Sequence, residues 1–202
     1  MDDRVVITLF RHGLTEANRR KEYLGWTDSP LCFSHSPSNM DYYELYFSSD
    51  LNRCIATLKK YAPDVKPHLL TEFREMNFGV FEGKTYEQLK DCEDYQKWIA
   101  WPFKHTPPNG EAFEDFSIRI EDGWQKVINT IEKKQARKTL IMTHGGVIRY
   151  LLTTYAPNKR EFWDWSVSHE MGYELIFDRD GLRRGERCTL LREVPLTANE
   201  HG

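Results

Sequence analysis

Val5-Val6-Ile7-Thr8-Leu9-Phe10, followed at once by Arg11-His12-Gly13, is the stretch that decides the fold of this chain. Residues 5–10 form a short, apolar and β-branched run, which is typical of a strand buried on both faces of a parallel sheet. A second run of this kind covers residues 139–143 and leads into His144-Gly145-Gly146. We therefore predict two core strands that each end in a histidine followed by glycine.

Strand and helix patterns alternate along the rest of the chain. Shorter strand candidates cover residues 45–47, 68–70, 173–177 and 189–192, and helical patterns cover 50–61, 85–98, 113–134 and 147–155. In the longest helical pattern, apolar residues recur every three or four positions, which marks one buried face. This alternation predicts an α/β fold, a three-layer sandwich with a mostly parallel central sheet flanked by helices on both faces.

The composition is that of a folded domain with balanced charge. The 202 residues include 28 Lys and Arg against 31 Asp and Glu, a formal net charge of −3, and 40% are hydrophobic. Nucleic-acid binders that grip phosphates usually carry a basic excess, and a membrane span needs about 18 consecutive apolar residues. We therefore expect neither a nucleic-acid nor a membrane partner. We expect a single domain over residues 1–202, with a polar tail after about residue 194.

The cysteines and the first residues indicate a cytoplasmic protein. Cys32, Cys54, Cys92 and Cys188 stand far apart, without paired Cys or Cys/His spacing. We interpret them as reduced thiols, and we expect no structural zinc. The chain starts without a cationic leader or a small-residue cleavage site.

The two strand-end histidines are the first candidates for chemistry. Ligands of open α/β sheets bind beyond the carboxyl ends of the strands, so His12 and His144 are expected to face one cleft. The glycines that follow allow a close approach of the backbone, and the N–H groups at a helix start attract anions. For either histidine alone, an ordinary strand-end residue with local hydrogen bonds is the simpler interpretation.

Three charged residues extend this set: Arg11, Arg53 and Glu75. Arginine offers permanently charged, bidentate donors to phosphate oxygens. A neutral histidine can act as a nucleophile, and a glutamate can donate and recover a proton. Taken singly, Arg53 could be a solvated helical residue and Glu75 could pair with Arg74. Together, the five residues are a suitable set for a phosphoryl group.

The motifs around these residues resemble the histidine phosphatase family, which includes the cofactor-dependent phosphoglycerate mutases. Arg11-His12-Gly13-Leu14-Thr15-Glu16-Ala17-Asn18 is similar to the family signature RHGxTxxN. Further matching blocks follow in the family's order over most of the chain: residues 25–31, 48–53 with Thr57, 74–79 with 81–85, 107–111 and 144–149. The resemblance implies a phosphoglycerate-mutase-like fold.

The resemblance also implies a role for each site residue. His12 would attack phosphorus and become a phosphohistidine, while Arg11, Arg53 and a protonated His144 would hold the phosphoryl oxygens. Glu75 would protonate the leaving oxygen and then activate water. Asn18, with the backbone around Gly13 and Gly145, would add hydrogen bonds. His12 would start neutral, its other ring nitrogen donating to a backbone carbonyl. Because these cations suffice for a phosphoryl transition state, no metal and no cofactor are expected.

The chain departs from the family pattern at two places. Residues 32–47 contain Pro37 and few helix formers, so the helix usual there is expected to be shortened or lost. The mutases insert a basic segment between the glutamate and the second histidine motif. Here the interval 76–143 is short, and residues 95–108 hold aromatics and prolines with only two lysines. We therefore favour a phosphatase that acts on a small phosphorylated substrate.

Residues 78–85, Trp98 and the Pro-Pro-Asn-Gly-Glu loop are similar to α-ribazole phosphatases and to small broad-specificity relatives. Trp98, Trp101, Phe103 and His105 could form a lid over an aromatic or apolar leaving group, or could be a helix end packed on the sheet. We expect Trp163 and Trp165 to belong to the core.

Three other functions stay open: a phosphoglycerate mutase, a catalytically weak phosphate-binding module, and a zinc hydrolase using His12, His144 and Glu75. Arg11 beside His12 disfavours a dication. The sequence leaves open the physiological substrate, the pathway and the oligomeric state, monomer or dimer.

Overall fold

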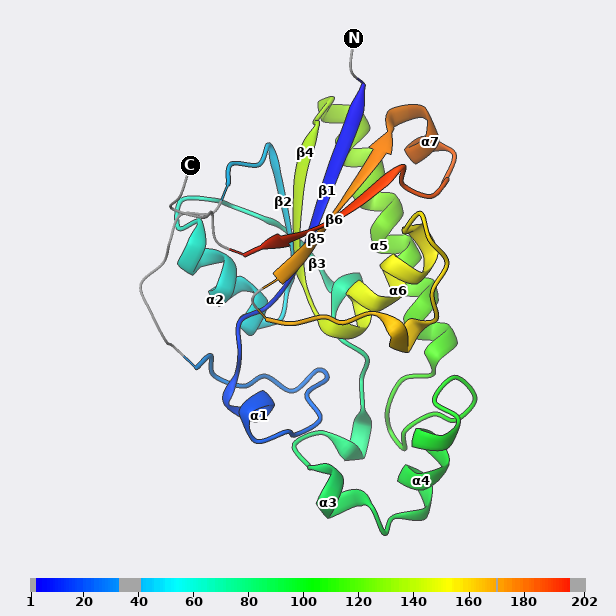
Figure 1. Cartoon of the computed structure of the whole chain (residues 1–202). Helices are drawn as coiled ribbons and strands as arrows, with labels where there is room; N and C mark the ends of the chain where they lie inside the picture. The colour runs from blue at the N-terminus through cyan, green and yellow to red at the C-terminus, as the bar shows by residue number, and fades with distance from the viewer. Residues whose placement is uncertain (1–2, 33–40, 170, 197–202) are drawn as a thin grey trace.

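The computed structural model describes residues 3–32, 41–169 and 171–196, and the central element is a single six-stranded sheet (Figure 1). Its order is β3-β2-β4-β1-β5-β6. The strands are β1 (Arg4–Arg11), β2 (Leu45–Ser49), β3 (His68–Leu70), β4 (Lys138–Thr143), β5 (Met171–Asp178) and β6 (Leu190–Pro195). The first four pair in parallel, and β5 runs antiparallel between β1 and β6. The predicted mostly parallel sheet is confirmed.

Helices cover both faces of the sheet, as predicted. The long helix α5 (Phe113–Lys134) and α6 (Gly145–Tyr155) pack on one face, where Trp124 and Tyr155 stack with ring centroids 4.8 Å apart. Helix α2 (Asn52–Tyr61) covers the other face and buries Leu58 against strand residues. Each strand therefore has apolar cover above and below, which is why β1 reads as a continuous apolar run.

The predicted helix over residues 85–98 is wrong in part, because it is broken into α3 (Tyr86–Leu89) and α4 (Glu93–Ala100). Leu89 and Tyr95 are six positions apart and would point about 120° apart on one straight helix. The break brings both into a small cluster with Phe81 and Trp98, separate from the main core. This cluster lies beyond the lower edge of the sheet in Figure 1.

Several short elements were not predicted from the sequence. They are α1 (Glu16–Arg19), α7 (Arg179–Arg183) and the 3₁₀ turns η1 (Thr71–Phe73), η2 (Gly79–Phe81) and η3 (Phe162–Asp164). Turn η1 crosses α5 so closely that a Cβ on Gly123 would lie 2.8 Å from the Cβ of Glu72. The glycine therefore allows η1 to dock on α5, which fixes the start of the loop that carries Glu75.

Two expectations fall at the edges of the described residues. Half of the segment 32–47, in which the helix was expected to be shortened or lost, lies outside them (residues 33–40), and residues 41–44 contain no helical turn before β2. The expected tail begins slightly later, because β6 continues to Pro195 and Leu196 is buried.

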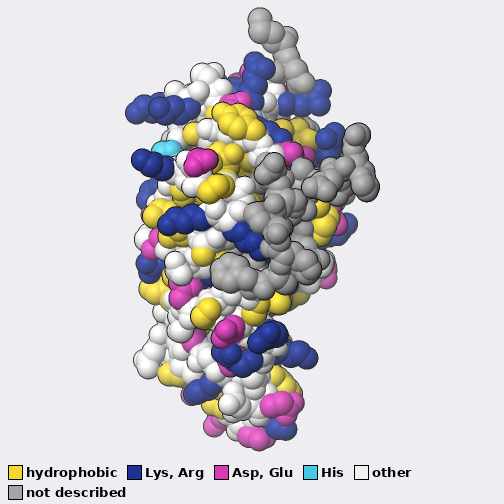
Figure 2. Space-filling model, turned by 90° about the vertical axis from the view of Figure 1, so that its left-hand side faces the viewer, with side chains coloured by type: hydrophobic (Ala, Val, Ile, Leu, Met, Phe, Trp, Pro, Cys, Tyr) yellow, Lys and Arg dark blue, Asp and Glu magenta, His cyan; other side chains and the backbone are white. Residues whose placement is uncertain are grey.

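None of the helices in the described part is both long and apolar enough to cross a membrane. Figure 2 shows Lys and Arg interspersed with Asp and Glu on the face that it presents.

Candidate active site

His12 and His144 meet at the carboxyl ends of β1 and β4, as predicted. The register pairs Arg11 with Thr143, and the His12 amide donates to the Thr143 carbonyl at 3.0 Å. The two imidazole centroids are 5.2 Å apart. Parallel neighbours place equivalent strand ends at one edge of the sheet, so this juxtaposition follows from the strand order.

His12 is buried and held in one orientation. Its Nδ1 lies 2.8 Å from the Gly13 carbonyl, so an Nδ1–H donor leaves the Nε2 lone pair available. The Gly13 amide in turn donates to the Thr57 hydroxyl at 2.8 Å. Burial lowers the pKa of His12 well below its usual range, and the Arg53 and Arg11 guanidiniums lower it further. The ring is therefore neutral at neutral pH, as a nucleophile requires.

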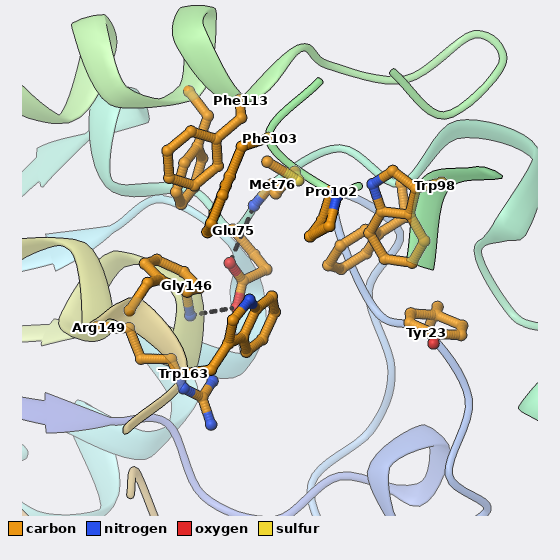
Figure 3. Close-up of a pocket in the computed structure, with 13 residues that line it drawn as sticks. Tyr23, Glu75, Met76, Trp98, Pro102, Phe103, Phe113, Gly146, Arg149 and Trp163 are labelled. Carbon is orange, nitrogen blue, oxygen red and sulfur yellow. Dashed lines mark hydrogen bonds between the residues drawn. The ribbon is translucent and has the colours of Figure 1, made fainter. Parts of the chain in front are cut away.

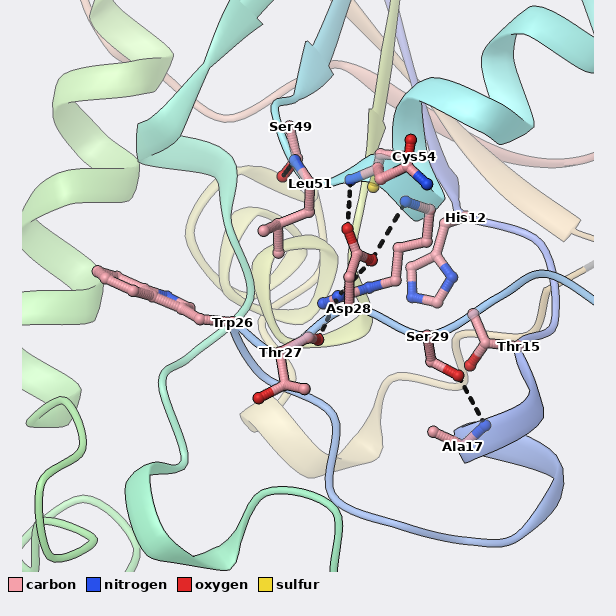
Figure 4. A network of polar contacts seen from close by, with 12 residues as sticks. His12, Thr15, Ala17, Trp26, Thr27, Asp28, Ser29, Ser49, Leu51 and Cys54 are labelled. Carbon is pink, nitrogen blue, oxygen red and sulfur yellow. Dashed lines mark hydrogen bonds and ion pairs between the residues drawn. The ribbon is translucent and has the colours of Figure 1, made fainter.

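Arg53 is almost fully buried, so the solvated-surface alternative is wrong. Its guanidinium donates to the carbonyls of Thr27 at 3.0 Å and Gly25 at 2.6 Å, and it lies 3.3 Å from Asp28. Asp28 also accepts the Asn52 amide at 2.6 Å, which joins the loop to the start of α2. Figure 4 shows this network beside His12.

Arg11 and Arg53 each have a buried Nε–H without an acceptor among the described residues. The Nη1 of Arg11 donates to the Val167 carbonyl at 2.9 Å. Buried donors normally have partners, and an unpaired one costs about 1–3 kcal/mol. Two such donors beside a neutral histidine are suited to the oxygens of a bound phosphoryl group.

His144 is neutral while the site is empty. It is fully buried, and burial, followed by the nearby Arg53, lowers its pKa well below its usual range, so the ring is neutral in this ligand-free site. Its Nε2 lies 2.9 Å from the Ser49 hydroxyl and 3.4 Å from the Cys54 thiol. The expectation that a protonated His144 holds the phosphoryl oxygens concerns the occupied site and stays a prediction.

Glu75 lies across the first turn of α6 and does not pair with Arg74, which binds Asp50 instead at 2.8 Å. The carboxylate accepts one hydrogen bond from the Met76 amide and one from the Gly146 amide, each at 3.0 Å. A Cβ on Gly146 would lie 2.2 Å from Oε1 of Glu75. The second glycine of the His-Gly-Gly motif is thus required by the position of this carboxylate.

Arg119 of α5 is a site-supporting residue that the sequence did not single out. Its guanidinium donates to the carbonyls of Arg74 at 2.7 Å and Glu75 at 2.9 Å and forms an ion pair with Glu111. The only sequence signal was Glu111, at the end of the Pro-Pro-Asn-Gly-Glu loop. This ion pair holds the loop that presents Glu75.

Asn18 and Gly145 lie at the rim of the site. The Oδ1 of Asn18 lies 2.9 Å from the Thr15 hydroxyl in the capping box of α1. Asn18 also lines a polar pocket together with Arg11 and His169. Gly145 begins α6, and a Cβ there would lie 3.5 Å from Cζ of Arg11. The roles of both residues in binding a phosphoryl group stay predictions.

His169 is a second residue that the sequence did not indicate. Its Nδ1 lies 2.7 Å from the His12 carbonyl, and its ring stands edge-on to the His12 ring with centroids 5.4 Å apart. Burial and the neighbouring Arg11 lower the pKa of His169 to about 4. It is therefore a neutral donor that holds the main chain of His12 from a segment more than 150 residues later.

Replacing His169 with alanine is expected to lower kcat about tenfold with little change in KM, because a displaced nucleophile is the main consequence. His169→Asn keeps an N–H donor and is expected to recover part of the loss. Steady-state kinetics of both variants check this, with Ser166→Ala, an exposed position on the same segment, as the control. Equal losses in both His169 variants would argue against a positioning hydrogen bond.

Among the described residues, no group of three or more His, Cys, Asp or Glu side chains is arranged to hold a metal ion. The site combines the buried His12–His144 pair with two guanidiniums, Arg11 and Arg53, and with the Glu75 carboxylate at the first turn of α6. This combination is chemically suited to phosphoryl transfer, with the guanidiniums as donors to phosphoryl oxygens and the neutral histidine as a candidate nucleophile.

Comparison with known proteins agrees with this chemistry. Residues 36–184 match the histidine phosphatase superfamily (branch 1). The chain belongs to this superfamily. It is 30% identical to the adenosylcobalamin/alpha-ribazole phosphatase of Salmonella typhimurium, over 71% of this chain and 76% of the relative. It is 27% identical to a 2,3-bisphosphoglycerate-dependent phosphoglycerate mutase of Cytophaga hutchinsonii, over 73% of this chain and 75% of that protein.

Solved structures show the same fold. The alpha-ribazole phosphatase from Shigella flexneri matches with a TM-score of 0.78 and 23% identity over 98% of both chains. A phosphoglycerate mutase from Bacillus anthracis matches with a TM-score of 0.68 and 23% identity, over 91% of this chain and 98% of the other. The phosphoglycerate-mutase-like fold expected from the sequence is confirmed.

Proposed function

We propose that this protein is a metal-independent phosphomonoester hydrolase that works through a phosphohistidine on His12. The observation that carries this proposal is the neutral, buried His12 beside Arg11 and Arg53, each with a buried Nε–H that lacks a protein acceptor. A phosphoryl group bound there would satisfy both donors. The alternative of a weak binding module does not require a neutral, oriented nucleophile.

The residues suffice for two balanced steps. In the first, Nε2 of His12 forms a bond to phosphorus, the ester P–O bond breaks, and Glu75 in its protonated form gives its proton to the leaving oxygen. In the second, the Glu75 carboxylate takes a proton from water, the resulting oxygen attacks phosphorus, and the P–N bond breaks. Arg11 and Arg53 hold the phosphoryl oxygens throughout, since most of the catalysis is electrostatic.

His144 would supply a third positive charge in this mechanism, because its protonation state can change when a phosphoryl group binds. In the ligand-free site, burial keeps the ring neutral. A phosphoryl dianion next to it would raise the pKa and favour uptake of a proton. His144 would then donate to a phosphoryl oxygen, as the family resemblance implies. Substrate binding, rather than the empty site, would create the third cation.

Relatives named for alpha-ribazole phosphatase activity support α-ribazole phosphate, or a broader set of small phosphorylated metabolites, as substrate. Phosphoglycerate mutase is the second candidate, supported by relatives of that name. The surroundings of Glu75 favour hydrolysis, since the cavity there is lined mainly by aromatic and aliphatic side chains, with Arg149 as its one cationic lining residue in the described chain.

A product assay separates these functions. We expect free phosphate from phenyl phosphate and from α-ribazole phosphate, and no 2-phosphoglycerate from 3-phosphoglycerate with the bisphosphate primer present. We also expect the same rate with a chelator, which separates this enzyme from a zinc hydrolase. Formation of 2-phosphoglycerate as the main product would replace the proposal with the mutase, and no turnover of any ester would favour a binding module.

A further inference from the structure

A cavity of about 170 Å³ opens directly beside Glu75, and its walls are mainly aromatic (Figure 3). Three segments far apart in the sequence build one wall. Phe103 follows α4, Phe113 begins α5, and Phe162 lies in η3. Their ring centroids are 4.5 Å apart for Phe103 and Phe113, 5.8 Å for Phe103 and Phe162, and 5.5 Å for Phe113 and Phe162. Edge-to-face contacts of this kind make a preformed wall.

The aromatic lining of the cavity starts next to the Glu75 carboxylate. The position of a Cβ built on Gly146 lies 2.2 Å from Oε1 of Glu75 and 3.3 Å from Cζ of Phe116. Figure 3 shows Trp163 beside Glu75, with Phe103 and Phe113 on its other side. Because Glu75 would protonate the ester oxygen, the part of the leaving group next to that oxygen must enter this cavity.

The Glu75 carboxylate and Nε of Arg149 have partners within the protein, whereas the buried indole N–H of Trp98, which also lines the cavity, has no acceptor among the described residues. Both Glu75 oxygens accept backbone amides. Arg149 donates from Nε to the Trp165 carbonyl at 3.1 Å, and its guanidinium carbon lies 5.7 Å from the centre of the Trp163 ring. A leaving group with several hydroxyls would lose its water there and find few new partners, which costs binding free energy.

We propose that the preferred leaving alcohol carries an aromatic ring that enters this cavity. This inference rests on the proposed hydrolase and names its substrate class. Trp163 and Phe103 are the residues that select the ring. The structure corrects one sequence expectation and confirms another, since Trp163 is 59% exposed rather than part of the core, whereas Trp165 is buried as expected.

Residues 98–105, which the sequence leaves open as a lid or as a packed helix end, line two different surfaces of the structure. Trp98 packs in the Phe81 cluster and reaches the cavity, and Phe103 lines the cavity. Trp101 faces a neighbouring outer groove, with the Lys104 ammonium 5.2 Å from its ring centre. His105 lines neither. Trp101 and Trp163 are each 59% exposed, but of the two only Trp163 lines the cavity beside Glu75. Trp101 is therefore a matched control position for Trp163.

The test compares benzyl phosphate with ethyl phosphate, because their alcohols have similar acidity and differ mainly in the ring. We expect the unmodified protein to prefer benzyl phosphate. Trp163→Ala is expected to lower kcat/KM for benzyl phosphate about ten- to hundredfold and for ethyl phosphate less than about threefold. Trp163→Phe is expected to recover most of the loss, and Trp101→Ala to leave both substrates unchanged.

Equal losses for the two esters in Trp163→Ala, or no preference for benzyl phosphate in the unmodified protein, would overturn the aromatic leaving-group site. The hydrolase itself would survive either result, provided that ethyl phosphate is cleaved in a reaction that needs His12. Failure to cleave either ester, with no phosphohistidine formed, would instead overturn the proposed function. Thermal unfolding of each variant checks that the fold is intact.

Discussion

Replacing His12 with alanine is expected to lower turnover of every phosphomonoester by at least about 10⁴-fold, because it removes the nucleophile of a two-step reaction. Arg11, Arg53 and Glu75 remain in place, so substrate can still bind. The second expected result is the loss of covalent phosphate on the protein. Histidine-bound phosphate is labile in acid and stable in base, so rapid quenching of the unmodified protein with labelled substrate should reveal it.

His105→Ala is the matched control for this variant. His105 is an exposed histidine that lines neither the cavity beside Glu75 nor the outer groove. We expect it to keep normal turnover and normal phosphoenzyme. If His12→Ala hydrolysed its substrates at the normal rate, the phosphohistidine mechanism would be wrong, whatever the substrate is.

Glu75→Gln is expected to have the second-largest effect, and the effect should depend on the leaving group. Glutamine can still accept one backbone amide, so the loop geometry is largely kept. For alkyl phosphates, loss of the proton donor should slow the first step about 10²- to 10⁴-fold. 4-Nitrophenolate leaves without a proton, so the first step should be nearly normal with 4-nitrophenyl phosphate.

Dephosphorylation still needs the Glu75 carboxylate to activate water in both cases. The variant should therefore release a burst of 4-nitrophenol and accumulate phosphohistidine, which stopped-flow absorbance and acid-labile labelling can measure. Glu87→Gln, a 72% exposed glutamate on α3, is the control. Equal slowing of both ester classes, without a burst, would assign Glu75 a structural role instead.

The fold and the pairing of the two histidines could be predicted from local sequence. Residues 5–10 and 139–143 are apolar runs that suit a doubly covered parallel sheet, and each leads into a histidine. Parallel strands present their carboxyl ends at one edge, so His12 and His144 had to approach each other if β1 and β4 were neighbours. The five candidate residues are brought to one region by this edge and by the loop after η1.

Electrostatic states could not be predicted in this way. Arg53 is a charged residue near a helix start, and nothing in its neighbours along the chain indicates that its side chain is fully buried beneath the 25–28 loop. The charge of His144 depends on the same burial. Protonation and desolvation are set by all the surrounding atoms, most of which come from distant segments.

By itself, the sequence determined the sheet, its helical cover and the histidine, arginine and glutamate residues at its edge, because strand periodicity and motif spacing are local properties. Tertiary structure alone decided how the 85–98 helix breaks to bury Leu89 with Tyr95, and how Trp163 joins Phe103 beside Glu75. It also brought Nδ1 of His169 within hydrogen-bond distance of the His12 carbonyl. These contacts depend on packing between segments distant in the chain, and no local pattern encodes which segments will meet.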